Sequence, residues 1–188
     1  GWVHDVNLHH RGEPTLHPRL GEMIRYAGGR GVKTKLHTNA TLLNGERARE
    51  LLESGLTLIS FSVDGYDKNN YEQVREGADF EKTMDNICRF LRLKKEAGAD
   101  NPRTVMEIME LGESPPDSFR KRGFIRRLRD AGLDRLIVKR PHNWAGNISG
   151  GQTKQERYSV CTFPWHGLVV LWDGTVGGCP HDFFAQII

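Results

Sequence analysis

The sequence predicts an α/β fold with a parallel sheet, and three observations support this. Apolar, β-branched runs alternate with segments of helical periodicity from the start of the chain to about residue 138. The helical segments carry boundary signals, such as Pro18 or Asn44 at a start and Gly132 after an end. Strand–helix–strand order requires parallel strands joined by helical crossovers. The periodicity does not distinguish a barrel from a doubly wound sheet.

The predicted elements follow one another without long gaps. Short apolar runs predict strands over residues 2–8, 32–38, 56–63, 104–111 and 133–138. Amphipathic segments predict helices over residues 18–28, 44–52, 79–97 and 117–131. These elements form the first predicted domain, residues 1–140.

The character of the chain changes after this domain. Residues 141–157 are rich in glycine, asparagine, glutamine and serine, which is typical of a linker. In the second domain, residues 158–188, the runs 168–172 and 175–179 flank Asp173-Gly174 and predict a β-hairpin with a two-residue primed turn. The chain starts with Gly1 and ends in the apolar stretch 183–188, so we expect both domains to be incomplete.

Composition narrows the functional classes. The chain of 188 residues has 37% hydrophobic and 27% charged residues, with no apolar run long enough to span a membrane and no leader segment. We therefore expect a cytoplasmic protein without a membrane partner. A net charge of +3 does not favour a nucleic-acid partner, and the basic residues between Lys121 and Arg129 predict a solvated helix face.

The three cysteines are Cys88, Cys161 and Cys179, an odd number without a secretory signal. This pattern favours burial or metal ligation over a disulfide framework. Cys88 shares a helix face with apolar residues such as Met84 and Leu91, so we predict that it packs in the core.

Polar residues follow three successive predicted strands. Gly12-Glu13-Pro14 follows the first strand, Thr38-Asn39 the second, and Ser62-Val63-Asp64-Gly65 the third. In parallel α/β proteins, ligands bind at the carboxyl ends of the strands. These residues therefore predict a ligand site at that edge, although Asn39 and Asp64 can instead close their own turns.

Together with Leu16-His17-Pro18 and Arg75, these landmarks resemble the radical S-adenosylmethionine superfamily over about residues 3–139. The resemblance implies a partial (β/α)6 TIM-like barrel, here without its first strand, with S-adenosylmethionine lying across the strand ends. Arg11 stands where the family usually has a glycine. The cofactor-binding residues implied by the resemblance are Gly12, Glu13, Thr38, Asn39, Ser62, Asp64 and Arg75.

The second domain resembles the start of a SPASM domain, from Cys161-Thr162-Phe163-Pro164-Trp165 to Cys179-Pro180-His181-Asp182. Such domains hold auxiliary 4Fe-4S clusters, and the resemblance puts forward Cys161 and Cys179 as metal ligands. From the residues alone, two alternatives stay open. One is zinc bound by Cys161, Cys179 and His181, and the other is two buried free thiols.

The family builds its catalytic cluster on a Cys-x3-Cys-x2-Cys segment, which this sequence does not contain. The resemblance implies a parent enzyme that cleaves S-adenosylmethionine to a 5′-deoxyadenosyl radical. This radical would abstract hydrogen from a peptide or small-molecule substrate, with flavodoxin or ferredoxin as reductant. We expect the chain alone to be inactive. The alternatives are a catalytically dead nucleoside-binding module and a zinc hydrolase using His10, His17, His37 and Glu13.

Overall fold

The computed structural model describes residues 2–110, 119–139 and 160–182. The chain divides into two compact units, Gly1–Arg140 and Pro141–Ile188. The predicted linker, residues 141–157, and the terminal stretch 183–188 lie outside the described residues. Within the described part of the chain, no helix combines the length and the apolar character needed to cross a membrane.

The first unit contains a five-stranded sheet in which all neighbouring strands are parallel and follow chain order. Its strands are β1 (Asp5–Asn7), β2 (Lys33–Thr38), β3 (Leu58–Asp64), β4 (Arg103–Met109) and β5 (Arg135–Lys139). Its helices are α1 (Leu20–Gly28), α2 (Gly45–Glu53), α3 (Lys68–Val74), α4 (Phe80–Glu96) and α5 (Phe119–Ala131). The parallel α/β prediction is confirmed.

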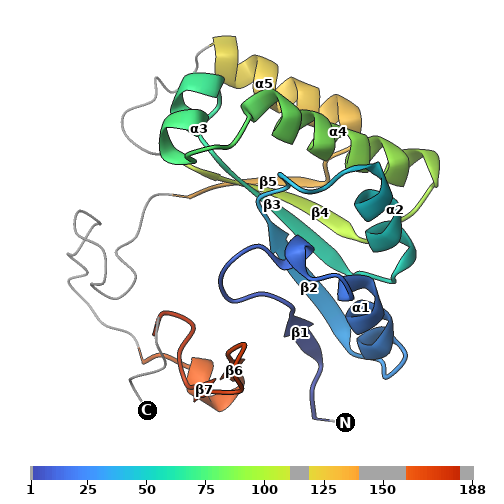
Figure 1. The fold of residues 1–188 in the computed structure, drawn as a ribbon, viewed down its shortest axis with the longest axis vertical. Coiled ribbons are helices and arrows are strands. Elements are labelled where there is room, and N and C mark those ends of the chain that lie inside the picture. Colours follow the sequence, from blue (N-terminus) through green and yellow to red (C-terminus); the bar gives the residue numbers. More distant parts are fainter. Residues whose placement is uncertain (1, 111–118, 140–159, 183–188) are drawn as a thin grey trace. The chain divides into compact units, whose positions relative to one another are not determined.

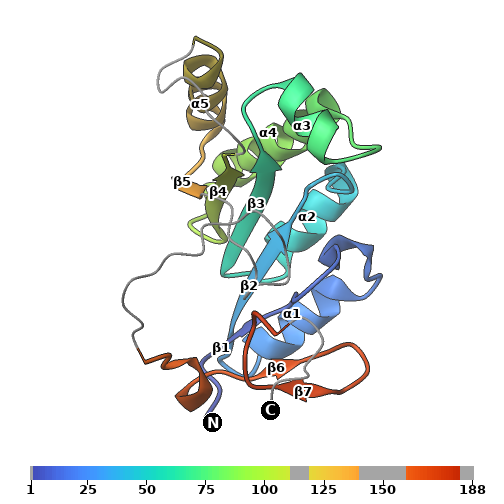
Figure 2. The same ribbon diagram turned by 90° about the vertical axis from the view of Figure 1, so that its left-hand side faces the viewer.

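All five helices lie on one side of this sheet, as Figures 1 and 2 show. Sequential strand order with right-handed crossovers places every connecting helix on the same face. Capping side chains fix where several helices begin. The Asn44 side chain accepts a hydrogen bond from the Arg47 amide at the start of α2. The Asp79 side chain accepts one from the Lys82 amide at the start of α4.

Helix α3 was not predicted from the sequence. It has seven residues and little apolar periodicity, with Tyr71 as its buried side chain. Its start is marked by Asp67, whose side chain accepts a hydrogen bond from the Asn70 amide. A capping aspartate was therefore the available signal.

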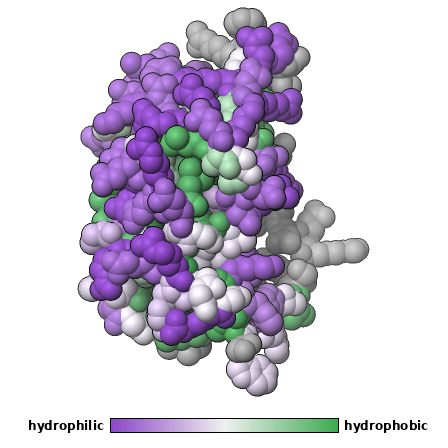
Figure 3. Space-filling view, turned by 90° about the vertical axis from the view of Figure 1, so that its right-hand side faces the viewer, coloured by the Kyte–Doolittle hydropathy of each residue, from purple (hydrophilic) through white to green (hydrophobic). Residues whose placement is uncertain are grey.

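The core lies between the sheet and the helices. Alternate residues of β2 and β3, such as Leu36, Ile59 and Phe61, are fully buried there, and the Phe61 ring meets that of Phe90 of α4 edge-on at 5.6 Å. The outer surface of this side is largely hydrophilic (Figure 3). The intervening strand residues point to the opposite face, where polar side chains such as His37 and Ser62 are only partly buried.

In the second unit, β6 (Val169–Val170) pairs antiparallel with β7 (Val176–Gly177). The predicted two-residue turn is wrong. The Leu171 amide donates to the Thr175 carbonyl at 2.8 Å, the Gly174 amide donates to the Leu171 carbonyl at 3.1 Å, and Gly174 has a φ of 87°. This is a three-residue connection with glycine in the left-handed region, which shifts the register by one residue from the prediction.

Candidate cofactor-binding site

Glu13 is the centre of a hydrogen-bond network at the carboxyl end of the sheet. It caps a short 3-10 helix, Pro14–Leu16, and its Oε1 accepts from the Thr15 amide at 3.1 Å and from the Thr15 hydroxyl at 2.5 Å. The same oxygen accepts from the Thr38 hydroxyl at 2.6 Å, and Oε2 accepts from the Asn39 amide at 2.8 Å. These contacts fix the carboxylate between the segments that follow β1 and β2.

All four donors to Glu13 are uncharged, and among the described residues the Glu13 carboxylate has no ion-pair partner. Oε2 accepts only one of these four bonds, and each carboxylate oxygen has about two lone-pair sites, so Oε2 keeps acceptor capacity. The site therefore has a fixed negative charge that the described chain does not neutralise.

The neighbouring predicted residues also have defined partners. Asn39 closes its own turn, because its Oδ1 accepts from the Thr41 amide at 3.0 Å and the Thr41 hydroxyl at 2.7 Å. Asp64, at the end of β3, accepts from Arg75 Nε at 2.6 Å in a partly buried ion pair. Ser62 lies opposite Glu107 of β4 on the helix-free face.

Asn39 and Arg75, two of the predicted site residues, line one cavity of about 470 Å³. Its wall includes Asn39 and Thr41 after β2 and the segment from Arg75 to Asp79 before α4. Gly12, by contrast, has a φ of 73° and no atom within 4 Å of the place where a Cβ would be, so the backbone there is open to approach. The structure thus brings Glu13, Thr38 and Asn39 together, and pairs Asp64 with Arg75.

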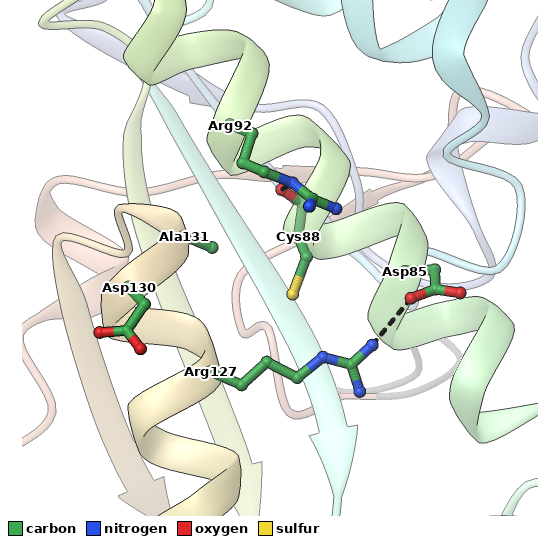
Figure 4. A pocket seen from close by; sticks show the side chains of 6 residues that line it. All are labelled: Asp85, Cys88, Arg92, Arg127, Asp130 and Ala131. Carbon is green, nitrogen blue, oxygen red and sulfur yellow. Dashed lines mark hydrogen bonds and ion pairs between the residues drawn. The ribbon is translucent and has the colours of Figure 1, made fainter.

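The cysteines differ in environment. Cys88 is buried, as predicted, and burial raises the pKa of its thiol. It borders a cleft of about 420 Å³ between α4 and α5, where Arg127 binds Asp85 at 2.8 Å (Figure 4). Cys161 is exposed and Cys179 partly buried, both as free thiols.

Metal sites were tested on the described residues. No group of three or more His, Cys, Asp or Glu side chains in that part of the chain is arranged to hold a metal ion. The zinc alternatives, with His181 beside the two cysteines or with His10, His17 and His37 beside Glu13, therefore have no structural support there. Cys161 and Cys179 are too few to hold a 4Fe-4S cluster on their own.

A second polar group was missed from the sequence. His9, after β1, stacks on His37 of β2 with ring centroids 4.4 Å apart, and Glu107 of β4 lies 3.8 Å from His37 Nδ1. Lys139 of β5 forms an ion pair with Glu107. A charged residue inside an otherwise apolar strand, as at Glu107, was the available signal.

The carboxyl edge of a parallel sheet, where this chain gathers polar side chains, is the place where α/β proteins bind ligands. The Radical SAM superfamily model matches residues 8–109, more than half of the chain. The chain belongs to the radical SAM superfamily.

Among curated proteins, a tungsten-containing aldehyde ferredoxin oxidoreductase cofactor-modifying protein of Pyrococcus furiosus is 32% identical over 107 residues, covering 55% of this chain and 29% of that protein. A PqqA peptide cyclase of Bradyrhizobium diazoefficiens is 30% identical over 98 residues, covering 52% and 24%. The chain thus spans less than a third of the length of these relatives. The dead-module and zinc-hydrolase alternatives are not favoured.

Among solved structures, Streptococcus suis SuiB bound to its precursor peptide SuiA matches with a TM-score of 0.58 at 15% identity, over 77% of this chain and 30% of SuiB. SuiB bound to S-adenosylmethionine matches with a TM-score of 0.54 at 17% identity, over 72% and 29%. At these identities the likeness is one of fold.

Proposed function

We propose that this chain supplies the S-adenosylmethionine-binding part of a radical SAM enzyme. The observation that carries the proposal is the Glu13 carboxylate, which is fixed by uncharged donors and has no described ion-pair partner. The amino group of the methionine part of the cofactor is a cation, and a charge-assisted hydrogen bond to Glu13 Oε2 would neutralise this charge. Membership of the superfamily supports this assignment.

The other residues of the proposed site act around Glu13. Thr38 and Asn39 hold its carboxylate. In this proposal Gly12 would let the ligand approach the backbone, and Ser62 would bond a ribose hydroxyl. Arg75 and Asp64 form a pair beside the cavity that Asn39 and Arg75 line. In this proposal the sheet is part of a (β/α)6 barrel that the longer protein completes.

The cofactor and a 4Fe-4S cluster together supply a 5′-deoxyadenosyl radical, while residues of this chain bind and orient the cofactor. Because the sequence contains no Cys-x3-Cys-x2-Cys segment, we propose that the chain alone does not perform this cleavage. Cys161 and Cys179 of the second unit are proposed ligands of an auxiliary cluster in a SPASM domain, together with thiolates from elsewhere.

For the substrate, we propose a peptide rather than a small molecule. The names of two similar proteins support this, since one is a peptide cyclase and the other was solved with a precursor peptide. A small one-electron carrier, flavodoxin or ferredoxin, is the proposed reductant. Free cysteines and the lack of a described membrane-spanning helix agree with a cytoplasmic enzyme.

The cofactor site is tested by Glu13→Gln in the full-length protein, with S-adenosylmethionine binding measured by equilibrium dialysis. Losing one charge-assisted hydrogen bond of roughly 1.5 to 3 kcal/mol predicts an about ten- to hundredfold weaker affinity. Glu22→Gln, on the exposed side of α1, is the matched control and should bind like the wild type. Unchanged affinity in Glu13→Gln would remove Glu13 from the site.

The inactivity of the chain is tested separately. After anaerobic reconstitution with iron and sulfide, the 188-residue chain should form no 5′-deoxyadenosine above a protein-free control. The full-length protein treated in the same way is the positive control. Cleavage by the short chain would show that its own residues suffice to hold a catalytic cluster.

A further inference from the structure

The helix-free face of the sheet carries a connected group of titratable side chains. It consists of His37 on β2, Glu107 on β4, Lys139 on β5 and His9 just after β1; we name it the His37 cluster. Strand bodies of a parallel sheet are normally apolar on both faces. A charged cluster in the body of this sheet therefore calls for a role other than packing.

In this cluster a carboxylate lies beside an imidazole that can act as a base. Glu107 Oε1 lies 3.8 Å from His37 Nδ1, so it can stabilise a positive charge on that ring. Lys139 keeps Glu107 ionised, because its ammonium lowers the pKa of Glu107 although burial opposes ionisation. The His9 ring lies against the His37 ring at an angle of 38°.

Both imidazoles are held neutral at pH 7. Burial, together with the neighbouring His37 and His10, lowers the pKa of His9 to about 4, although Glu107 and Glu13 oppose the shift. Burial also lowers the pKa of His37 against the effect of Glu107. His9 Nδ1 is buried and has no hydrogen-bond partner among the described residues. A neutral imidazole can accept a proton, which an imidazolium cannot.

The cluster is accessible and adjoins the proposed cofactor site. The side chains of His37 and Lys139 are 30% and 46% exposed. Strand alternation directs the side chains of His37 and Thr38 to opposite faces of the sheet, so the cluster is connected to the Glu13 site through His9. The charges of Glu13 and Glu107 both act to raise the pKa of His9, so both carboxylates lie near its ring. A substrate on this face would lie beside the cofactor that Glu13 binds.

We propose that His37 accepts a proton from a weakly acidic O–H or N–H group of the substrate, with Glu107 stabilising the resulting imidazolium. The substrate X–H bond breaks, its electron pair stays on X, and a new N–H bond forms on the His37 ring. No oxidant or reductant is needed for this transfer. The inference rests on the proposed function, because it places the substrate next to the S-adenosylmethionine site.

The test uses 4-nitrophenol, a weak acid whose anion absorbs at longer wavelength than the neutral phenol. The full-length protein is titrated with it at a pH below the probe's own pKa. We expect saturable binding, with a larger ionised fraction of the bound probe than of the free probe at the same pH, seen as phenolate absorbance. His37→Gln should reduce this ionised bound form by about tenfold or more, the equivalent of one pKa unit.

Two further variants make the test specific. His4→Gln changes an exposed histidine outside the cluster and should behave like the wild type. Glu107→Gln keeps the shape of the side chain but removes the stabilising charge, so the probe should bind with a smaller ionised fraction. Circular dichroism verifies that each variant is folded.

No saturable binding, binding without ionisation, or ionisation that His37→Gln leaves unchanged would each overturn the proposal. None of these results depends on S-adenosylmethionine. The Glu13→Gln dialysis experiment therefore fails or succeeds independently, and the two proposals can be judged separately.

Discussion

Two carboxylates lie at opposite ends of the same sheet, and their partners differ. Asp134, just before β5, accepts from Lys94 Nζ at 2.7 Å, from the Thr104 amide at 2.7 Å and from the Thr104 hydroxyl at 2.8 Å. Glu13, at the carboxyl end, accepts an equally dense set of bonds from uncharged donors only. Among the described residues, Lys94 neutralises the charge of Asp134, whereas the charge of Glu13 has no ion-pair partner.

The two carboxylates connect different parts of the fold. The Lys94 side chain is 7% exposed and comes from α4, so its ion pair with Asp134 ties the helix layer to the sheet. Glu13 ties two loops together through Thr38 and Asn39, but its charge has no structural partner among the described residues. The two carboxylates are therefore alike in their dense hydrogen bonding and differ in whether a described cation pairs with them.

The largest expected effect is from Asp134→Ala. Removing it leaves the buried ammonium of Lys94 without its partner, and breaking such a pair costs about 3 to 5 kcal/mol of the free energy of unfolding. Urea denaturation of the 188-residue chain measures this. A loss below about 1 kcal/mol would mean that the ion pair of Asp134 with Lys94 does not stabilise the fold, and the contrast with Glu13 would fail.

A smaller loss of stability is expected from Glu13→Gln. The amide keeps one oxygen acceptor for the loop donors and strands no buried cation, so the cost should be about 1 to 2 kcal/mol. The same denaturation experiment measures it, with Glu22→Gln as the exposed control. A larger loss than that of Asp134→Ala would reverse the comparison.

The sequence was sufficient to predict much of this arrangement. The parallel pairing of the strands followed from alternating periodicity, and the predicted helix starts near Asn44 and Asp79 were correct. Gly12-Glu13 and Thr38-Asn39 were expected at one edge because parallel strands end together. Their meeting in one hydrogen-bond network agrees with that expectation, while their role in cofactor binding stays a prediction.

Other features depend on partners that sequence spacing does not reveal. Asp134 and Lys94 lie far apart in the chain and meet only because α4 packs over the sheet. The residues of the His37 cluster each come from a different segment of the chain, so no local sequence motif predicts the cluster. The predicted hairpin turn was one residue shorter than the observed one, because Asp-Gly suits both a two-residue and a three-residue connection.

The remaining expected effects are two acid-dependent losses of stability, one at each end of the sheet. Near Glu13, the pKa of His9 is about 4 in the folded chain against 6.5 when unfolded, so the unfolded chain binds the proton first between these values. Stability should therefore be constant above pH 6.5 and fall from there toward pH 4.

At the other end of the sheet, hydrogen bonds from Lys94 and Thr104 lower the pKa of Asp134 below its usual 3.8 against the effect of burial. Stability from this group should be present above pH 3.8 and be lost only below it.

Urea denaturation at a series of pH values separates these two windows, because the upper one belongs to His9 with its neighbours His37 and His10, whose pKa values are also lowered, and the lower one includes Asp134. His9→Gln should flatten the decline between pH 6.5 and 4 and leave the acid limb unchanged. Asp134→Asn should do the reverse, at the cost of a lower stability at neutral pH. If His9→Gln left the upper window unchanged, His9 would not be buried beside His37 as the structure has it, and the carboxyl end of the sheet would lose the neutral imidazole that the proton-acceptor proposal requires.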